Sequence, residues 1–306
     1  ADGSAEPRII AEGHDFYSFP RVSPDGTRLV WTTWDHPRMP WDGTDLWVGT
    51  LNQDSTLSDV LHVAGGPEES IFQPAWSPDG TLHLISDRTG WWNLYALKDG
   101  ELIPLAPMDA EFGVPQWVFG LTTYDFLQDG RIACLYSQRG LTHLGVITPG
   151  SGRVEPVETS FTAFRSIRTA PAGDQVWVIA ASASHPASVA SIDLQTGNAT
   201  VVRKSLDVDL DPGYLSIPEP IEFPTDGGLT AHALFYRPAN RDFIGPEGER
   251  PPLLVLSHGG PTGQTTSALN LEIQFWTSRG FAVVDVNYGG STGYGREYRE
   301  RLKGNW

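Results

Sequence analysis

A turn signature that recurs four times constrains the fold of this chain more than any other feature. Ser-Pro-Asp-Gly occurs at 23–26 and again at 77–80, and weaker copies lie at 127–130 and 170–174. In such a turn proline presets φ, aspartate hydrogen-bonds to its own backbone, and glycine supplies a positive φ. The first two thirds of the chain are therefore predicted to consist of repeats of one supersecondary unit.

Each repeat has room for four short strands. Segments rich in β-branched and aromatic residues accompany the turns, as at 45–50 and 92–97. The 3.6-residue apolar spacing of helical repeats is not found in this part of the sequence. Roughly 40–50 residues with four short strands is the period of a propeller blade. We therefore predict a β-propeller over residues 1–215 with four or five blades, either a complete small propeller or part of a larger one.

The pattern changes in the last ninety residues. A hairpin is predicted around the turn at 225–228. The segments 253–257 and 281–286 are short and continuously apolar, as expected for buried parallel strands. Between them, 269–279 has the apolar spacing of a helix. This order predicts that residues 216–306 form the N-terminal portion of an α/β-hydrolase domain.

His-Gly-Gly follows the first of these buried strands, at 258–260. Acyl transfer produces an oxyanion that needs preorganised hydrogen-bond donors, and glycines let a backbone N–H approach it closely. In this fold, the loop after the third strand supplies one such N–H. We predict that the amide of Gly260 is an oxyanion donor and that His258 belongs to its loop. The alternative is an ordinary tight turn.

Residues 289–293 match Gly-x-Ser-x-Gly, the signature of a nucleophile elbow. In this fold, the catalytic serine is followed in the chain by the acid and then the histidine, but no Asp or His follows Ser291. Only one strand separates Ser291 from the His-Gly-Gly loop, whereas the elbow belongs one strand later. We therefore predict a glycine-rich loop beside the active site, with the nucleophile outside this chain.

Composition limits the partners and cofactors. The net charge of −16 opposes binding to nucleic acid. Cys134 is the only cysteine and is expected to be a small buried hydrophobe, and no pattern supports a metal or another cofactor. No apolar run reaches the roughly 18 residues needed to span a membrane, and no signal peptide is visible. We therefore expect no membrane partner and a cytoplasmic location, with an incomplete N-terminus and no indication of oligomeric state.

The motifs at 258–261 and 287–296 resemble those of the prolyl oligopeptidase family of serine peptidases. The similarity is to the branch of acylaminoacyl-peptidase and dipeptidyl-peptidase-like enzymes, whose propeller blades resemble residues 86–95. One departure is Gly289, where many members have arginine, and it indicates a bacterial aminopeptidase-like subgroup. The resemblance implies a seven-bladed propeller that gates access to a hydrolase domain. It also implies cleavage of short peptides or aminoacyl amides by a Ser-Asp-His triad.

The resemblance also implies where the substrate binds. The triad is expected beyond Trp306, so this chain is expected to be an inactive fragment that lacks the rest of the hydrolase domain. Some relatives hold the substrate's amino terminus with paired glutamates from the propeller, which suits an ammonium group. Glu68 and Glu69 are candidates for this role, and the alternative for them is a solvated turn between blades. Glu111 is a second candidate, and Tyr294 is a further substrate-binding candidate.

Two other functions remain open. A propeller can be a non-enzymatic module that binds proteins, and this chain has no triad of its own. Such a scaffold would not need the buried strands and the glycine loop at 253–306. An esterase shares the opening of the hydrolase domain, but a propeller that narrows access suits peptides better than lipids.

Overall fold

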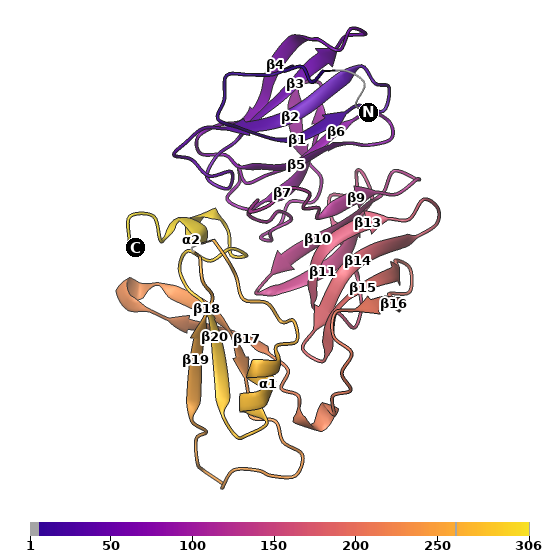
Figure 1. Cartoon of the computed structure of the whole chain (residues 1–306). Coiled ribbons are helices and arrows are strands. Elements are labelled where there is room, and N and C mark those ends of the chain that lie inside the picture. The colour runs from indigo at the N-terminus through magenta and orange to yellow at the C-terminus, as the bar shows by residue number, and fades with distance from the viewer. Residues whose placement is uncertain (1–5, 261, 306) are drawn as a thin grey trace.

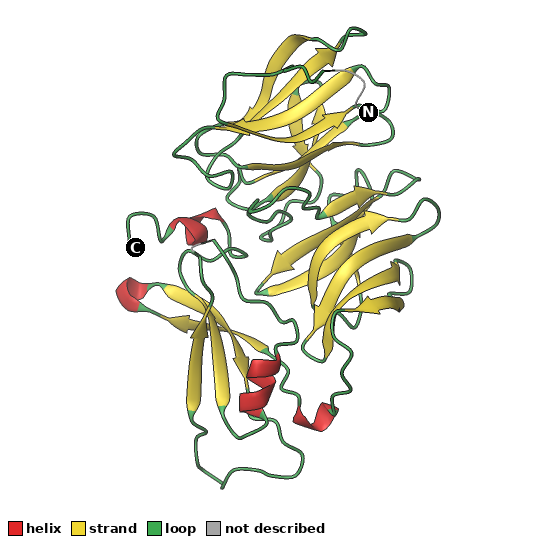
Figure 2. Cartoon of the chain, viewed as in Figure 1, coloured by secondary structure: helices red, strands yellow, loops and turns green. Residues whose placement is uncertain are grey.

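The computed structural model describes residues 6–260 and 262–305, which form five four-stranded sheets with little helix (Figures 1 and 2). The motif residues 1–4 and 261 lie outside the described residues. Four sheets follow one another along the chain as an arc, and a mixed sheet follows them (Figure 1). No helix in the described part of the chain is long and apolar enough to cross a membrane.

The first four sheets are antiparallel, and their strands lie in chain order. The first contains β1 (Phe16–Val22), β2 (Arg28–Trp34), β3 (Asp45–Leu51) and β4 (Leu57–Gly65). The second contains β5 (Ile71–Trp76), β6 (Leu82–Ser86), β7 (Asn93–Lys98) and β8 (Glu101–Pro104). The third contains β9 (Tyr124–Phe126), β10 (Ile132–Gln138), β11 (Leu141–Ile147) and β12 (Val154–Val157). The fourth contains β13 (Ala163–Thr169), β14 (Gln175–Ser182), β15 (His185–Asp193) and β16 (Ala199–Lys204).

The repeated turn joins the first strand to the second in every one of these four sheets. The N–H of Gly26 donates to the carbonyl oxygen of Ser23 at 2.9 Å. Gly26, Gly80, Gly130 and Gly173 all have a positive φ, between 74° and 86°, which side-chain-bearing residues seldom adopt. Each sequence repeat is therefore one blade. The predicted β-propeller is confirmed, with four blades in the chain.

The last sheet contains both parallel and antiparallel strands, in the order β17-β18-β20-β19. Its members are β17 (Glu219–Pro224), β18 (Thr230–Tyr236), β19 (Leu253–Ser257) and β20 (Ala282–Asn287). The helical segments near it are η1 (Pro212–Tyr214), η2 (Asp226–Gly228), α1 (Leu271–Thr277) and α2 (Arg296–Glu300). The hairpin β17–β18 and the parallel pair β19–β20 are those predicted, and α1 lies within the predicted helix. The predicted boundary at 215/216 falls between β16 and β17.

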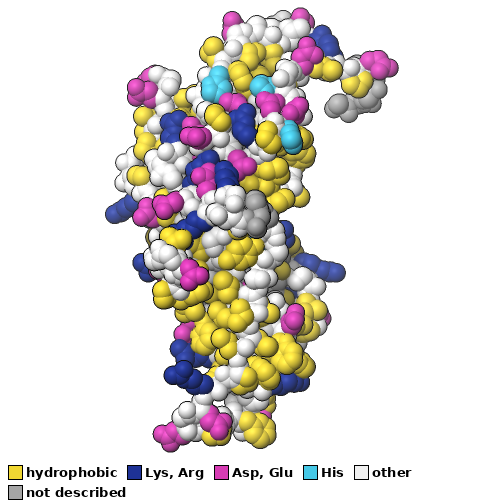
Figure 3. Space-filling view, turned by 90° about the vertical axis from the view of Figure 1, so that its left-hand side faces the viewer, with side chains coloured by type: hydrophobic (Ala, Val, Ile, Leu, Met, Phe, Trp, Pro, Cys, Tyr) yellow, Lys and Arg dark blue, Asp and Glu magenta, His cyan; other side chains and the backbone are white. Residues whose placement is uncertain are grey.

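Strand β19 is an edge of this sheet because β20 is its only partner among the described strands. Leu253 and Val255 on β19 are 53% and 65% exposed. Figure 3 looks at the side on which β19 lies and shows hydrophobic side chains gathered over the lower half of the molecule. On the other side of the sheet, Ile273 of α1 packs with Leu234 and Val283.

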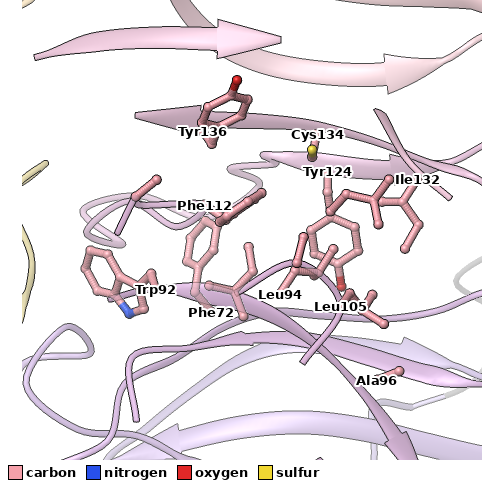
Figure 4. Packing of buried hydrophobic residues seen from close by; sticks show 14 of the residues in the cluster. Phe72, Trp92, Leu94, Ala96, Leu105, Phe112, Tyr124, Ile132, Cys134 and Tyr136 are labelled. Carbon is pink, nitrogen blue, oxygen red and sulfur yellow. The ribbon is translucent and has the colours of Figure 1, made fainter. Parts of the chain in front are cut away.

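Hydrophobic clusters join the blades to one another. Phe72 and Trp92 from the second blade meet Phe112, Tyr124 and Cys134 in a core that also reaches the first blade (Figure 4). Cys134 is fully buried, and burial raises the pKa of its thiol, so the expected buried hydrophobe is confirmed. A second cluster joins the third blade to the fourth. Neighbouring blades thus share their cores, as propeller blades must to bury their sheet faces.

Candidate active site

Two loops meet where the parallel strands β19 and β20 end. The first loop begins at His258, directly after β19, and the second begins at Tyr288, directly after β20. The carboxyl ends of parallel strands lie at one edge of a sheet, which is where ligands bind in open α/β sheets. The sheet thus brings together two motifs that are about thirty residues apart in the sequence.

The second loop holds the first through Tyr288. The rings of Tyr288 and His258 stack with their centroids 4.5 Å apart and their planes at 19°. The Tyr288 hydroxyl lies 3.0 Å from the carbonyl oxygen of Gly260 and 3.2 Å from that of His258, and it can donate to either. The Nε2 atom of His258 makes a hydrogen bond of 2.7 Å with the hydroxyl oxygen of Ser291.

Gly260 has the conformation that the glycine-loop prediction requires of a free donor. Its φ is +74°, which strongly favours glycine, and a Cβ at this position would meet no atom within 4 Å. The residue is exposed, and its N–H makes no hydrogen bond to any described residue. An exposed, unengaged backbone N–H in an anchored loop can donate to an oxyanion.

Ser291 and His258 form a hydrogen-bonded pair, but the pair lacks two features of a nucleophilic site. Ser291 is fully buried, so a substrate cannot reach its hydroxyl oxygen. The Nδ1 atom of His258 faces the carbonyl oxygen of Gly259 at 3.3 Å, and no carboxylate within the described residues bonds to this histidine. A catalytic triad needs an acid at this position. This geometry favours the interpretation of Ser291 as a residue that supports the loop.

Glu111 links the propeller to the second loop. One of its carboxylate oxygens accepts a hydrogen bond from the N–H of Trp92 at 2.8 Å, and the other accepts one from the N–H of Gly295 at 3.1 Å. Its side chain is almost completely buried, and burial raises the pKa of the carboxyl to about 7, although the nearby Arg299 opposes this shift. Both oxygens are thus occupied by backbone donors on opposite sides of the interface.

Asp87 pairs with two arginines of α2 at the same interface. Its Oδ2 atom lies 2.8 Å from Nη1 of Arg296 and 2.7 Å from Nη2 of Arg299. The Asp87 carboxyl is fully buried, and burial raises its pKa while the two guanidinium groups lower it. The guanidinium of Arg299 also lies 4.1 Å from the ring centroid of Trp92. The propeller therefore contacts α2 through charges that are shielded from water.

Comparisons with known proteins match this arrangement. A sequence profile of the prolyl oligopeptidase family matches residues 267–306. The structure of a puromycin hydrolase is 40% identical over 98% of this chain, with a TM-score of 0.88, and that of a puromycin-hydrolyzing peptidase of Mycobacterium tuberculosis is 39% identical over 98%, with a TM-score of 0.92. The chain belongs to the prolyl oligopeptidase family.

A curated relative in this family is dipeptidyl aminopeptidase BIII of Pseudoxanthomonas mexicana, which is 28% identical over 148 residues, or 46% of this chain. The chain spans 45% and 46% of the length of the two solved structures, and its alignment with the aminopeptidase covers 21% of that protein. No group of three or more His, Cys, Asp or Glu side chains in the described residues is arranged to hold a metal ion.

The glutamates proposed to bind the substrate differ in their surroundings. Glu69 forms an ion pair with Arg88, with its Oε1 atom 3.0 Å from Nε, and the same oxygen accepts a hydrogen bond from the Ser86 hydroxyl. Glu68 is exposed beside it. The Glu69 charge is therefore balanced within the propeller, whereas Glu68 faces solvent. Neither is among the residues that hold the glycine loop.

Tyr294 lies between the hydrolase sheet and the third blade. Its ring is parallel to that of His232 with the centroids 4.0 Å apart, and its hydroxyl accepts a hydrogen bond from Asn287 at 3.1 Å. Burial raises the pKa of this hydroxyl to about 12. A Cβ placed on Gly140 would lie 2.9 Å from the hydroxyl, so the third blade needs a glycine at that position. The tyrosine packs at the interface of the two parts.

Sequence reasoning missed the partners that hold the loop and the interface. Asp87, Tyr288, Arg296 and Arg299 lie inside or beside the family motifs, but no role follows from their types alone. A local signal did exist for Asp87, because a charged residue directly after the apolar strand β6 must find a buried partner. That partner lies more than 200 residues away in the sequence.

Proposed function

We propose that the whole protein is a serine exopeptidase that hydrolyses short peptides or aminoacyl amides. Membership of the prolyl oligopeptidase family and relatives named as puromycin hydrolase and dipeptidyl aminopeptidase support this proposal. Puromycin is itself an aminoacyl amide, so one substrate class covers both kinds of relative. In the proposal, the propeller (1–215) limits access to a hydrolase domain that begins at 216, and the Ser-Asp-His triad lies beyond Trp306.

The unengaged N–H of Gly260 is the observation that carries the proposal. When the serine hydroxyl attacks the amide carbonyl, the carbonyl oxygen becomes an oxyanion. Gly260 donates a hydrogen bond to this oxygen, and a second donor comes from the rest of the hydrolase domain. Collapse of the tetrahedral intermediate expels the amine and leaves an acyl-enzyme, which water then hydrolyses.

Recognition of the free amino terminus is the finer part of the proposal. Glu68 is the stronger candidate for pairing with the substrate ammonium because it is exposed, whereas Arg88 already binds Glu69. Glu111 can act only from inside the interface, because backbone donors occupy both of its oxygens. Tyr294 shapes the boundary between the propeller and the hydrolase sheet.

Labelling with a fluorophosphonate tests the proposed nucleophile. We expect the whole protein to hydrolyse an aminoacyl chromogenic amide and to be labelled at one serine beyond Trp306. The Ser291→Ala variant should be labelled equally, and residues 1–306 alone should not be labelled. Stoichiometric labelling at Ser291, or a whole protein that is neither labelled nor active, would contradict the proposal.

A further inference from the structure

Tyr288 contacts the peptide units on both sides of the one that carries the Gly260 N–H. That N–H belongs to the unit between Gly259 and Gly260. The Tyr288 hydroxyl lies 3.2 Å from the carbonyl oxygen of the preceding unit, which is that of His258. It also lies 3.0 Å from the carbonyl oxygen of Gly260, which begins the following unit. A single O–H shared between these two acceptors restrains both units and leaves the N–H between them free.

The side chain of Tyr288 is itself held in place. Its ring stacks on that of His258, and His258 is fixed at its far nitrogen by the Ser291 hydroxyl. The backbone before it is anchored by Asn287, which is fully buried. The Asn287 side chain accepts the N–H of Thr265 at 2.8 Å, and its carbonyl oxygen accepts the hydroxyl of Tyr298 at 2.6 Å. Tyr288 is therefore a rigid support and can transfer that rigidity to the glycine loop.

We infer that Tyr288 is a positioning residue for the Gly260 oxyanion donor. Gly259 and Gly260 have no side chains that could fix the loop from within, and a φ of +74° is one of several that glycine adopts. A preorganised donor needs its orientation set before the oxyanion forms, because reorganisation during the reaction raises the barrier. The hydroxyl of Tyr288 supplies that orientation. This inference rests on the proposed function of Gly260.

The Tyr288→Phe variant tests the role of the hydroxyl, because it keeps the stacked ring and removes only the O–H. In the whole protein, we expect kcat to fall roughly 10- to 100-fold, which is less than the roughly 10²–10³-fold loss when a donor is removed. KM should change less than threefold, because the hydroxyl does not touch the substrate. The matched control is Tyr214→Phe, which removes an exposed tyrosine hydroxyl bonded to Asp242, far from the loop.

A second measurement is independent of activity. In residues 1–306 labelled with ¹⁵N-glycine, the heteronuclear NOE of the Gly259 and Gly260 amides should fall in Tyr288→Phe and stay unchanged in Tyr214→Phe. Unchanged NOE values, or a kcat equal to that of the wild type, would overturn the positioning role. A wild-type protein without hydrolase activity would instead refute the proposed function, and the NOE comparison would still decide whether Tyr288 orders the loop.

Discussion

At the scale of single residues, Glu111 is the side chain whose environment departs furthest from water. Its carboxyl is enclosed between the propeller and the second loop, where it faces the guanidinium of Arg299 and lies near the second buried carboxylate, Asp87. Burial opposes ionisation more strongly than Arg299 favours it, so the pKa rises from 4.5 to about 7. The protonation state of the interface therefore changes near neutral pH.

This shift predicts a pH-dependent stability. The folded state binds the Glu111 proton more tightly than the unfolded state, so the stabilisation is complete below pH 4.5 and is lost as the pH rises to about 7. The Glu111→Gln variant cannot titrate here. The free energy of unfolding of the wild type relative to this variant should fall by up to about 3 kcal/mol across that window. Urea unfolding at pH 5, 6, 7 and 8 measures the difference, and a difference that is independent of pH would contradict the assignment.

At the scale of elements, α2 is attached to the propeller by the ion pairs of Asp87 with Arg296 and Arg299. The first residue of α2 also donates its N–H to the carbonyl oxygen of Gly90 at 2.7 Å. A helix of five residues is too short to be stable by itself, so its position depends on these contacts. The same contacts fix one end of the loop that carries Tyr288.

Removing the shared carboxylate should therefore be costly. In Asp87→Asn, the two arginines remain in the interface without their counter-charge, and we expect the free energy of unfolding to fall by about 3–5 kcal/mol. The control is Glu219→Gln, which breaks the exposed ion pair of β17 with Arg237 and should cost less than about 1 kcal/mol. Denaturant unfolding compares them, and losses of equal size would show that burial does not strengthen the Asp87 pairs.

At the scale of the whole molecule, two surfaces of the sheets remain open. The fourth blade exposes Trp177, Ile179 and Val189, each about two-fifths exposed, on one face. Strand β19 exposes its unpaired edge together with Leu253 and Val255 (Figure 3). Exposed apolar edges of this kind pair readily with other chains. We therefore expect residues 1–306 in isolation to self-associate through β19.

A lysine on this edge should suppress the association. Val255→Lys places a charge on the exposed strand, where pairing with another edge would bury it. Ile244→Lys is the matched control, because Ile244 is 97% exposed in the loop before β19 and belongs to no strand. Sedimentation velocity over a concentration series should show less association in Val255→Lys than in Ile244→Lys. Equal behaviour of the two variants, or a monomeric wild type, would exclude the β19 edge as the contact.

Features governed by local interactions could be predicted from the sequence. The Pro-Asp-Gly turns, the hairpin at 225–228 and the apolar strands before 258 and 287 each depend on residues that are close in the chain. Turn chemistry and apolar periodicity operate over a few residues, so they survive in any tertiary context. The glycine loop was found in the same way, from its place directly after a buried strand.

The sequence by itself therefore determined the blades, the order of the hydrolase elements and the location of the candidate oxyanion donor. Only the tertiary structure decided that Glu111 binds Gly295, 184 residues away, and that Asp87 binds Arg299, 212 residues away. It also decided that the buried Ser291 holds His258. The physical reason is that a charge or a hydroxyl specifies the kind of partner it needs, whereas the packing of distant sheets selects which residue becomes that partner.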